Sequence, residues 1–191
     1  KAAGLQIPSS IVGSQKEALS HFYSTHNNDC ISKGVQDILS FTVKKKGYHY
    51  TTSKIEQEDL DEMSDSFFPS LLQQYIQKKY ELRIVYLKER FFSMAIFSQN
   101  DEKTKVDFRN YNDEKPNRNV PFILPTHIES QLKTFMQSMN LDSGSIDMIV
   151  TPDNDYIFLE VNPSGQYGMT SIPCGYNLDY EIAQEIISTN A

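Results

Sequence analysis

Two apolar runs near the end of the chain, 145–150 ("SIDMIV") and 156–162 ("YIFLEVN"), are separated by a short polar segment. β-Branched and aromatic residues on either side of turn-forming residues are typical of an antiparallel hairpin. A two-residue loop at Asp153-Asn154 suits a tight turn. In that register Asp147 lies directly opposite Glu160, so the chain is predicted to build an antiparallel sheet that carries two facing carboxylates.

The same register divides the hairpin into two faces. Ile149 faces Phe158 on the side of the carboxylates. The other side is entirely apolar and is the predicted core face: Ile146, Met148, Val150, Ile157, Leu159 and Val161. A slip of one residue would exchange the two faces, so the prediction depends on the turn.

The facing carboxylates require an explanation. Directly opposed side chains lie roughly 4.5–5.5 Å apart at Cβ, where like charges are destabilising. Asn162 projects from the same face as Glu160 because strand side chains alternate. Two carboxylates and an amide oxygen suit Mg²⁺, which prefers oxygen ligands and commonly completes its shell with substrate phosphates. Asp147, Glu160 and Asn162 therefore form a candidate metal site; the alternative is a carboxylate that is protonated or solvated at a sheet edge.

The remaining elements indicate an α+β protein with a mostly antiparallel sheet. Strands are predicted at 71–76, 80–89, 90–99 and 106–111, and helices at 14–26 and 126–140. Each helix is preceded by a capping-box pattern, Ser14 with Glu17 and Thr126 with Glu129. The second helix places one apolar face toward the core: Ile128, Leu132, Phe135, Met136 and Met139.

Composition excludes several classes of protein. A net charge of −7 argues against a broad nucleic-acid surface. The lysines of "QKKYELR", Lys78 and Lys79, are interpreted as solvated charges on an edge strand. No apolar run approaches the roughly 18 residues of a membrane span. Cys30 and Cys174 form no disulfide framework, which favours a reduced, cytoplasmic protein.

Five separated elements of the sequence resemble ATP-grasp ligases. The hairpin "SIDMIVTPDNDYIFLEVNPSGQYGM" is similar to the strands on which an Asp and an E-x-N hold magnesium against ATP. "AAGLQIPSSIVG" resembles the "AGL-x-IP" entry segment, "ISKG" a phosphate-binding strand, and "LLQQYIQKKYELRIVYL" the hinge followed by an acidic-x-Arg strand. "KVDFRNY" resembles the "D-W-R" element of the graspeptide (microviridin-type) ligases, and "VNPSGQYGMTSIPCGYNLDYEIAQEI" resembles their grasp-with-spasm branch.

The resemblance implies an ATP-grasp fold of two lobes, 1–76 with the hinge and 77–191 with the metal site. Such ligases have a further domain before the "AGL-x-IP" segment. We therefore expect a missing N-terminal domain, and we expect these 191 residues alone to be inactive. Phe108 and Tyr167 stand where microviridin ligases carry Trp, which favours the grasp-with-spasm branch.

The resemblance also implies roles for individual residues. ATP and Mg²⁺ are the implied cofactors, with Asp147, Glu160 and Asn162 as metal ligands. Arg83 would reach the transferred phosphate as the catalytic residue, although a structural salt bridge with Glu81 is the alternative. The implied nucleotide-binding residues are Lys33, Gln73, Gln74, Tyr75 and Ile76, with Gln74 in place of the family's Glu. Asp107 and Arg109 would contact peptide or brace the site.

The implied activity is ATP-dependent ligation on a ribosomal precursor peptide. Asp or Glu side chains would be activated as acyl phosphates and joined to Ser, Thr or Lys as ω-esters or ω-amides. Two alternatives stay open: a small-molecule carboxylate–amine ligase of the same fold, and a non-catalytic nucleotide- or peptide-binding fragment. The expected partner is the precursor peptide, with neither nucleic acid nor membrane involved, and a homodimer is left open.

Overall fold

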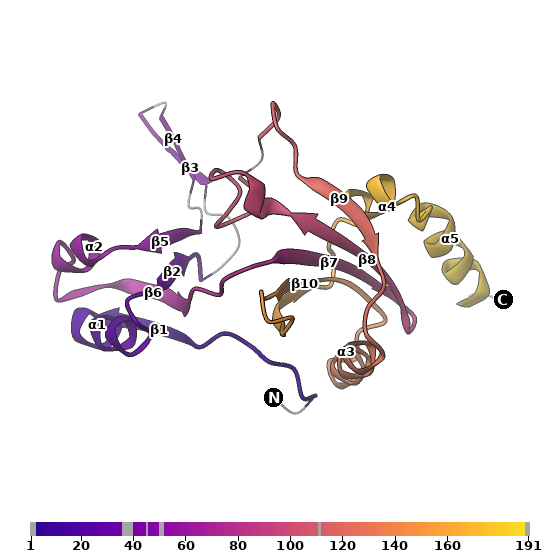
Figure 1. Ribbon diagram of the computed structural model, residues 1–191, viewed down its shortest axis with the longest axis horizontal. Coiled ribbons are helices and arrows are strands. Elements are labelled where there is room, and N and C mark those ends of the chain that lie inside the picture. The colour runs from indigo at the N-terminus through magenta and orange to yellow at the C-terminus, as the bar shows by residue number, and fades with distance from the viewer. Residues whose placement is uncertain (1–2, 36–39, 45, 50–51, 111, 190–191) are drawn as a thin grey trace. The chain divides into compact units, whose positions relative to one another are not determined.

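The structure is a computed structural model that describes residues 3–35, 40–44, 46–49, 52–110 and 112–189 (Figure 1). The chain forms two compact units. One comprises Pro8–Ile76, and the other comprises Lys1–Ile7 together with Gln77–Ala191. Within the described ranges, no helix combines the length and the apolar character that crossing a membrane requires.

The Pro8–Ile76 unit is built on a four-stranded antiparallel sheet in the order β1-β6-β2-β5. Helix α1 packs on β1 and β6, and a small cluster of Tyr23, Cys30 and Leu60 forms its buried core. The elements of this unit are β1 (Ser10–Gln15), α1 (Lys16–Thr25), β2 (Cys30–Lys33), the separate hairpin β3 (Ser40–Val43) and β4 (Lys46–His49), β5 (Ser53–Ile55), α2 (Gln57–Asp61) and β6 (Ser66–Gln74).

The predicted capping box of Ser14 and Glu17 is wrong. Helix α1 follows directly on β1, its N-cap is Gln15, and no side chain caps it. Gln15 is still paired with Ser66 of β6. The chain therefore enters the helix from an extended, sheet-paired residue, a long-range constraint that the local pattern does not contain.

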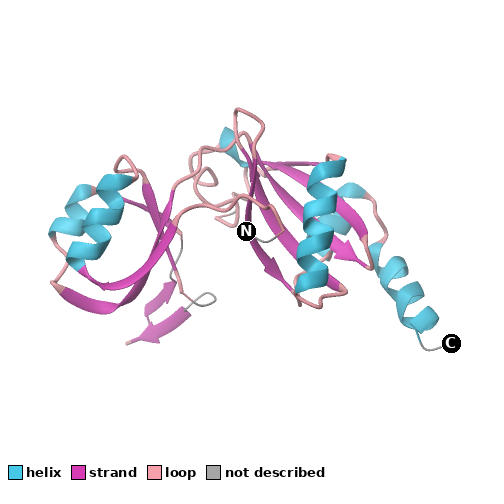
Figure 2. Ribbon diagram, turned by 90° about the horizontal axis from the view of Figure 1, so that it is seen from below, coloured by secondary structure: helices cyan, strands magenta, loops and turns pink. Residues whose placement is uncertain are grey.

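The second unit is built on a five-stranded antiparallel sheet in the order β11-β10-β7-β8-β9. Helix α3 lies along one face of this sheet (Figure 2). Helix α4 contacts β7, β8 and β9, and Arg90 of β8 forms ion pairs with Glu181 and Glu185 of α5. The elements are β7 (Tyr80–Leu87), β8 (Arg90–Phe97), the 3-10 turn η1 (Ser98–Asn100), β9 (Arg118–Phe122), α3 (Thr126–Ser138), β10 (Ser143–Val150), β11 (Tyr156–Asn162), α4 (Gly168–Cys174) and α5 (Leu178–Thr189).

The core of this unit lies between α3 and the sheet. It includes Ile128, Leu132 and Met136 from the helix and Leu82, Ile84, Ile146, Met148, Val150 and Phe158 from the strands. The predicted apolar face of the helix is confirmed for these three residues and for Phe135. It is wrong for Met139, which follows the helix as its C-cap and is 55% exposed. The capping box of Thr126 and Glu129 is also wrong, because Pro125 is the N-cap and its carbonyl accepts from Ile128 and Glu129.

The hairpin of β10 and β11 has a different turn from the predicted one. The backbone N–H of Thr151 donates to the carbonyl of Asp155, and Asn154 adopts a left-handed conformation with φ 66°. Three residues lie between this pair instead of two, so the register near the turn shifts by one. Val150 pairs with Tyr156 and Ile149 pairs with Ile157, and the predicted facing of Ile149 with Phe158 is wrong.

A β-bulge then restores the predicted register at the carboxylates. Met148 pairs with Phe158, but Asp147 pairs with Glu160, so Leu159 is the additional residue. The predicted opposition of Asp147 and Glu160 is therefore confirmed. The faces near the turn differ from the prediction, since Phe158 packs in the core against Phe135 with ring centroids 4.9 Å apart.

The predicted division into 1–76 and 77–191 puts residues 1–7 in the first lobe. In the structure they group with the second unit. Leu5 is buried in the core of the second unit. Gln6 forms a parallel bridge with Ile157, and the N–H of Phe158 donates to the carbonyl of Gln6 at 2.8 Å. Burial of Leu5 and this bridge hold Leu5 and Gln6 against the second unit.

Candidate functional site

A row of charged side chains crosses the sheet face that points away from α3. Arg83 of β7, Asp147 of β10 and Glu160 of β11 are register partners on three neighbouring strands. Their neighbours Leu82, Ile84 and Ile146 point to the opposite, core side. The alternation of strand side chains therefore gathers one cation and two carboxylates on a single surface.

Arg83 and Asp147 form an ion pair that is largely removed from solvent. Nη1 of Arg83 donates to Oδ2 of Asp147 at 2.6 Å, and the two side chains are 12% and 14% exposed. Nε of Arg83 and Oδ1 of Asp147 are buried without a hydrogen-bond partner among the described residues. Arg83 does not form the structural salt bridge with Glu81 that the sequence left as the alternative, because each of these residues has another partner.

Burial dominates the electrostatics of Asp147. It raises the pKa of the Asp147 carboxyl, whereas the ion pair with Arg83 lowers this pKa. The charge of Glu160 raises the same pKa, and that of Arg109 lowers it. Burial outweighs the neighbouring cations, so the pKa of Asp147 is raised overall. A further cation beside this carboxyl would favour its ionised form.

Asp107 and Arg109 lie in a turn, so the predicted strand at 106–111 is wrong over its described residues. Asp107 is buried and accepts three hydrogen bonds from the Arg109 guanidinium, at 2.8–3.1 Å, and one from the Arg109 backbone N–H at 3.0 Å. These hydrogen bonds raise the pKa of Arg109, as do the charges of Glu160 and Asp147. Asp107 therefore orients the Arg109 guanidinium through these hydrogen bonds.

Lys78 is buried, and its interpretation as a solvated edge-strand lysine is wrong. Nζ of Lys78 donates to Oε1 of Glu81 at 2.6 Å and to the carbonyl of Val106 at 2.9 Å. Ser98 donates a short hydrogen bond to the other carboxylate oxygen of Glu81. The sequence shows the i, i+3 spacing of Lys78 and Glu81. It does not show that the carbonyl of Val106, in a distant loop, also binds Lys78.

The loop after β11 fixes the geometry of Asn162. Its Oδ1 accepts the N–H of Ser164 at 3.0 Å, and its carbonyl accepts the N–H of Gly165 at 3.1 Å. Gly165 lies against Ser145, the register partner of Asn162. A Cβ at position 165 would be 2.3 Å from Cβ of Ser145, so only glycine permits this close approach.

The chemistry of this surface fits a hard divalent cation. Asp147 and Glu160 face each other, and Oδ1 of Asp147 is an unpartnered acceptor among the described residues. Among the described residues, no group of three or more His, Cys, Asp or Glu side chains is placed to hold a metal ion by itself. Two carboxylates and the amide of Asn162 would leave coordination positions for water or phosphate, as is common for Mg²⁺.

The other predicted site residues belong to the Pro8–Ile76 unit. Gln73 and Gln74 end β6, the central strand that pairs with both β1 and β2. Nε2 of Gln73 donates to Ser10 at 2.8 Å, and Gln73 is buried. The N–H of Tyr75 donates to the carbonyl of Asp29, and the ammonium of Lys54 lies 4.0 Å from the centre of the Tyr75 ring.

Ile76 and Lys33 are the two remaining candidates for nucleotide binding. Ile76 is half-buried and is the last residue of its unit. Lys33 ends β2 opposite Leu71 and is also half-buried. The roles of Lys33 and of Gln73–Ile76 toward a nucleotide stay predictions.

Comparison with known proteins identifies the fold. No family model matches the sequence, and no curated protein matches it. Among solved structures, the macrocyclase MdnC of Microcystis aeruginosa MRC, bound with the precursor peptide MdnA, is 31% identical with a TM-score of 0.84, over 98% of this chain and 56% of that one. The chain has the ATP-grasp fold of the graspeptide ligases.

Two further ATP-grasp structures support this assignment. A RiPP-associated ligase of Chryseobacterium gregarium, in complex with ADP and a leader and core peptide, is 28% identical with a TM-score of 0.79, over 87% of this chain and 50% of that one. The macrocyclase MdnB of Microcystis aeruginosa MRC is 27% identical with a TM-score of 0.70, over 97% of this chain and 55% of that one. The chain thus spans about half the length of these ligases, and its assignment to the grasp-with-spasm branch stays a prediction.

The contact between Gly165 and Ser145 predicts a specific stability effect in this ATP-grasp fold. Gly165→Ala should lower the free energy of unfolding by about 1–3 kcal/mol, since the added methyl meets Cβ and Oγ of Ser145. Gly168→Ala is the matched control, because nothing lies within 4 Å of its added Cβ. Chemical denaturation of the full-length variants measures both effects, and Ser145→Gly should partly restore the first. Equal stability of the two alanine variants would contradict the packing of this loop.

Proposed function

We propose that the chain is the nucleotide- and metal-binding part of a ligase that modifies a ribosomal precursor peptide. The observation that carries the proposal is the row of Arg83, Asp147 and Glu160 across β7, β10 and β11. The likeness to MdnC, which was solved with a precursor peptide, supports the choice of a peptide as substrate. The Chryseobacterium ligase was solved with ADP, which supports ATP as the co-substrate.

In the proposed reaction, an Asp or Glu side chain of the peptide attacks the γ-phosphate of ATP. An acyl phosphate forms as ADP leaves, and a Ser, Thr or Lys side chain then displaces phosphate to give an ω-ester or ω-amide. Catalysis of this kind depends on positioning and on charge neutralisation, because charge spreads over the transferred phosphoryl group. Arg83 and Arg109 supply positive charge beside the hairpin carboxylates, and the planar fork of Arg83 suits bidentate contact with phosphate.

Magnesium would be held by Asp147, Glu160 and Asn162. When bound, it would neutralise phosphate charge and fix the phosphates relative to the sheet. The ion pair with Arg83 keeps Oδ2 of Asp147 occupied and leaves Oδ1 as the acceptor for a cation. The hydrogen bond from Ser164 fixes the side chain of Asn162 before any ligand binds.

Glu160→Gln tests the metal site. Glu160 is exposed on the edge strand β11, so this change should alter the free energy of unfolding by less than about 0.5 kcal/mol. Affinity for Mn²⁺ in the presence of ADP, measured by electron paramagnetic resonance on the full-length protein, should fall at least about tenfold, because a carboxylate ligand becomes a neutral amide. Asp153→Asn at the exposed tip of the same hairpin is the matched control. Unchanged Mn²⁺ affinity in Glu160→Gln would favour the alternative of a carboxylate merely solvated at a sheet edge.

The substrate class is tested by mass spectrometry of the full-length protein with ATP, Mg²⁺ and a short synthetic peptide rich in Thr, Lys and acidic residues. We expect loss of one water for each cross-link formed. Mild alkaline hydrolysis would reopen esters and leave amides intact, which distinguishes the two products. ATP consumption with a small carboxylic acid and an amine, and with no change in peptide mass, would support the small-molecule ligase instead. Nucleotide binding without any turnover would support a non-catalytic module.

Arg83→Lys tests the catalytic residue in the same assay. The change keeps the charge and loses the planar fork, so kcat should fall at least about tenfold while the Kd for nucleotide changes less than about threefold. A thermal melt of the variant controls for loss of the ion pair with Asp147. If kcat falls only in proportion to the amount of folded protein, Arg83 has a structural role.

A further inference from the structure

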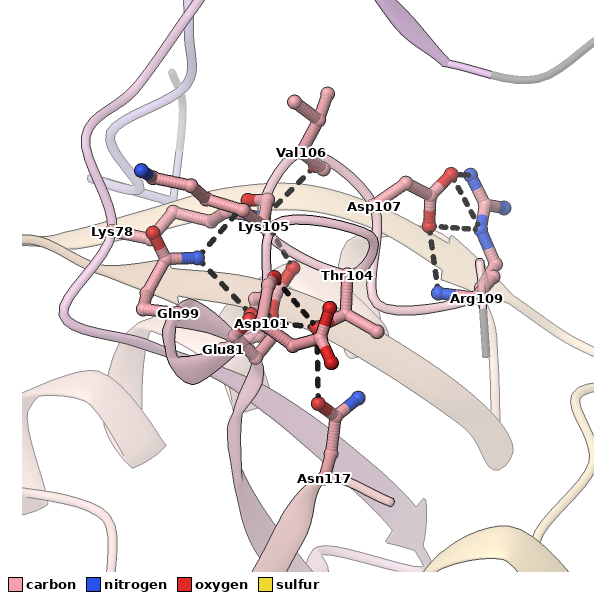
Figure 3. Close-up of polar contacts among 11 residues, drawn as sticks. Lys78, Glu81, Gln99, Asp101, Thr104, Lys105, Val106, Asp107, Arg109 and Asn117 are labelled. Atoms are coloured by element: carbon pink, nitrogen blue, oxygen red, sulfur yellow. Dashed lines mark hydrogen bonds and ion pairs between the residues drawn. The ribbon is translucent and has the colours of Figure 1, made fainter. Parts of the chain in front are cut away.

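The loop from Ser98 to Arg109 is tied to the start of β7 by buried polar groups (Figure 3). Lys78 binds the carbonyl of Val106 at 2.9 Å, and Glu81 accepts from Ser98. Gln99 donates to the carbonyl of Lys105 at 3.0 Å. These contacts hold both ends of the loop, on either side of its exposed tip at residues 102–103.

Thr104 closes the loop on itself. It is fully buried, and its hydroxyl donates to the carbonyl of Ser98 at 2.8 Å and lies 3.1 Å from Oδ1 of Asn117. Val106, which Lys78 holds, is the residue immediately before Asp107. A continuous path of contacts therefore runs from the ammonium of Lys78 through the peptide of residues 106–107 to the carboxylate that orients Arg109.

The buried Lys78 and Glu81 pair is costly as a source of stability alone. Removing two charges from water carries a desolvation penalty that their mutual attraction offsets only with good geometry, and apolar residues of similar volume often stabilise a fold as well or better. The side chains of Lys78 and Glu81 are only 3% and 6% exposed. An apolar pair, however, could bind neither the carbonyl of Val106 nor the hydroxyl of Ser98.

We propose that Lys78, together with Glu81, is a positioning residue that sets the place of the Arg109 guanidinium through the loop that carries Asp107. The inference rests on the proposed function, because it assigns Arg109 to the phosphate- and peptide-binding surface. Lys78 itself touches neither hairpin carboxylate in the described contacts and acts through the loop. A displacement of about 1 Å in a positioned group can reduce a rate about a hundredfold, so a tether of this kind has a measurable effect.

The test separates this role from a merely structural one by a double-mutant cycle in the full-length protein. Lys78→Met/Glu81→Met replaces the pair by apolar side chains and leaves no unpaired buried charge, so it keeps the protein folded even where Lys78→Met alone does not. We expect kcat/KM of this variant to fall about 10- to 100-fold in the wild-type background. In an Arg109→Ala background the same change should lower kcat/KM by less than about twofold, because the positioned group is already absent. Equal factors in the two backgrounds, or full activity of Arg109→Ala, would overturn the proposal.

Lys79→Met is the matched control. Lys79 is the neighbouring lysine, it is exposed, and its ammonium binds Oδ1 of Asn154 at 2.9 Å, away from the loop. We expect wild-type activity from this variant. A loss in Lys79→Met equal to that in the Lys78 variant would show a general effect of charge and would overturn the assignment to Lys78.

Hydrogen exchange tests the tether without any turnover. In the Lys78→Met/Glu81→Met variant, peptides covering 99–110 should exchange at least about tenfold faster, whereas those covering α3 should not change. Unchanged exchange at 99–110 would overturn the tether whatever the enzyme does. Faster exchange in a protein that shows no ligation would preserve the tether while the proposed function fails, so the two failures are distinguishable.

Discussion

The ion pair of Arg83 and Asp147 is the interaction on which the charged surface depends. It joins β7, the central strand of the five-stranded sheet, to its neighbour β10 at a point where both side chains are nearly buried. Removing either partner would leave the other as an uncompensated buried charge, which typically costs about 3–5 kcal/mol. The pair also determines which acceptor of Asp147 stays available, because among the described residues Oδ2 accepts from Arg83 and Oδ1 has no hydrogen-bond partner.

Charge balance on this surface explains why it suits a cation. The electrostatically linked groups are the carboxylates Glu81, Asp107, Asp147 and Glu160 and the cations Lys78, Arg83 and Arg109. The carboxylates outnumber the cations by one among these described residues. The cations lie beside the carboxylates in pairs, and Glu160, on the edge strand, is the most exposed of the four acids. A divalent cation at the hairpin would turn the net negative charge of these groups into a net positive charge, which would attract phosphate.

The sequence predicts the strands of this surface well and its long-range contacts poorly. Alternation of apolar and polar residues correctly separates Leu82 and Ile84 from Arg83, because a strand has a fixed period of two. The opposition of Asp147 and Glu160 was reached through an incorrect turn, and a bulge at Leu159 cancelled that error. Turn geometry and bulges depend on backbone conformations such as that of Asn154, which residue type only weakly determines.

Contacts between distant segments account for the remaining differences. Lys78 is buried, and it binds the carbonyl of Val106, which lies 28 residues later in the chain. Capping patterns at Ser14 and Thr126 failed because a paired strand and a proline, respectively, already determine how the chain enters each helix. Local rules describe what a segment does in isolation, and each of these residues is governed by a partner outside its segment.

The strands and the loop hold their charged side chains in different ways. Arg83, Asp147 and Glu160 are mounted on hydrogen-bonded strands, whose register fixes their spacing without further support. Arg109 comes from a turn and has no such register, so its position has to be specified by side-chain contacts. Asp107 fixes its guanidinium, and Lys78 fixes the peptide just before Asp107. The buried polar network is therefore found beside Arg109, a charged group that the sheet itself does not hold.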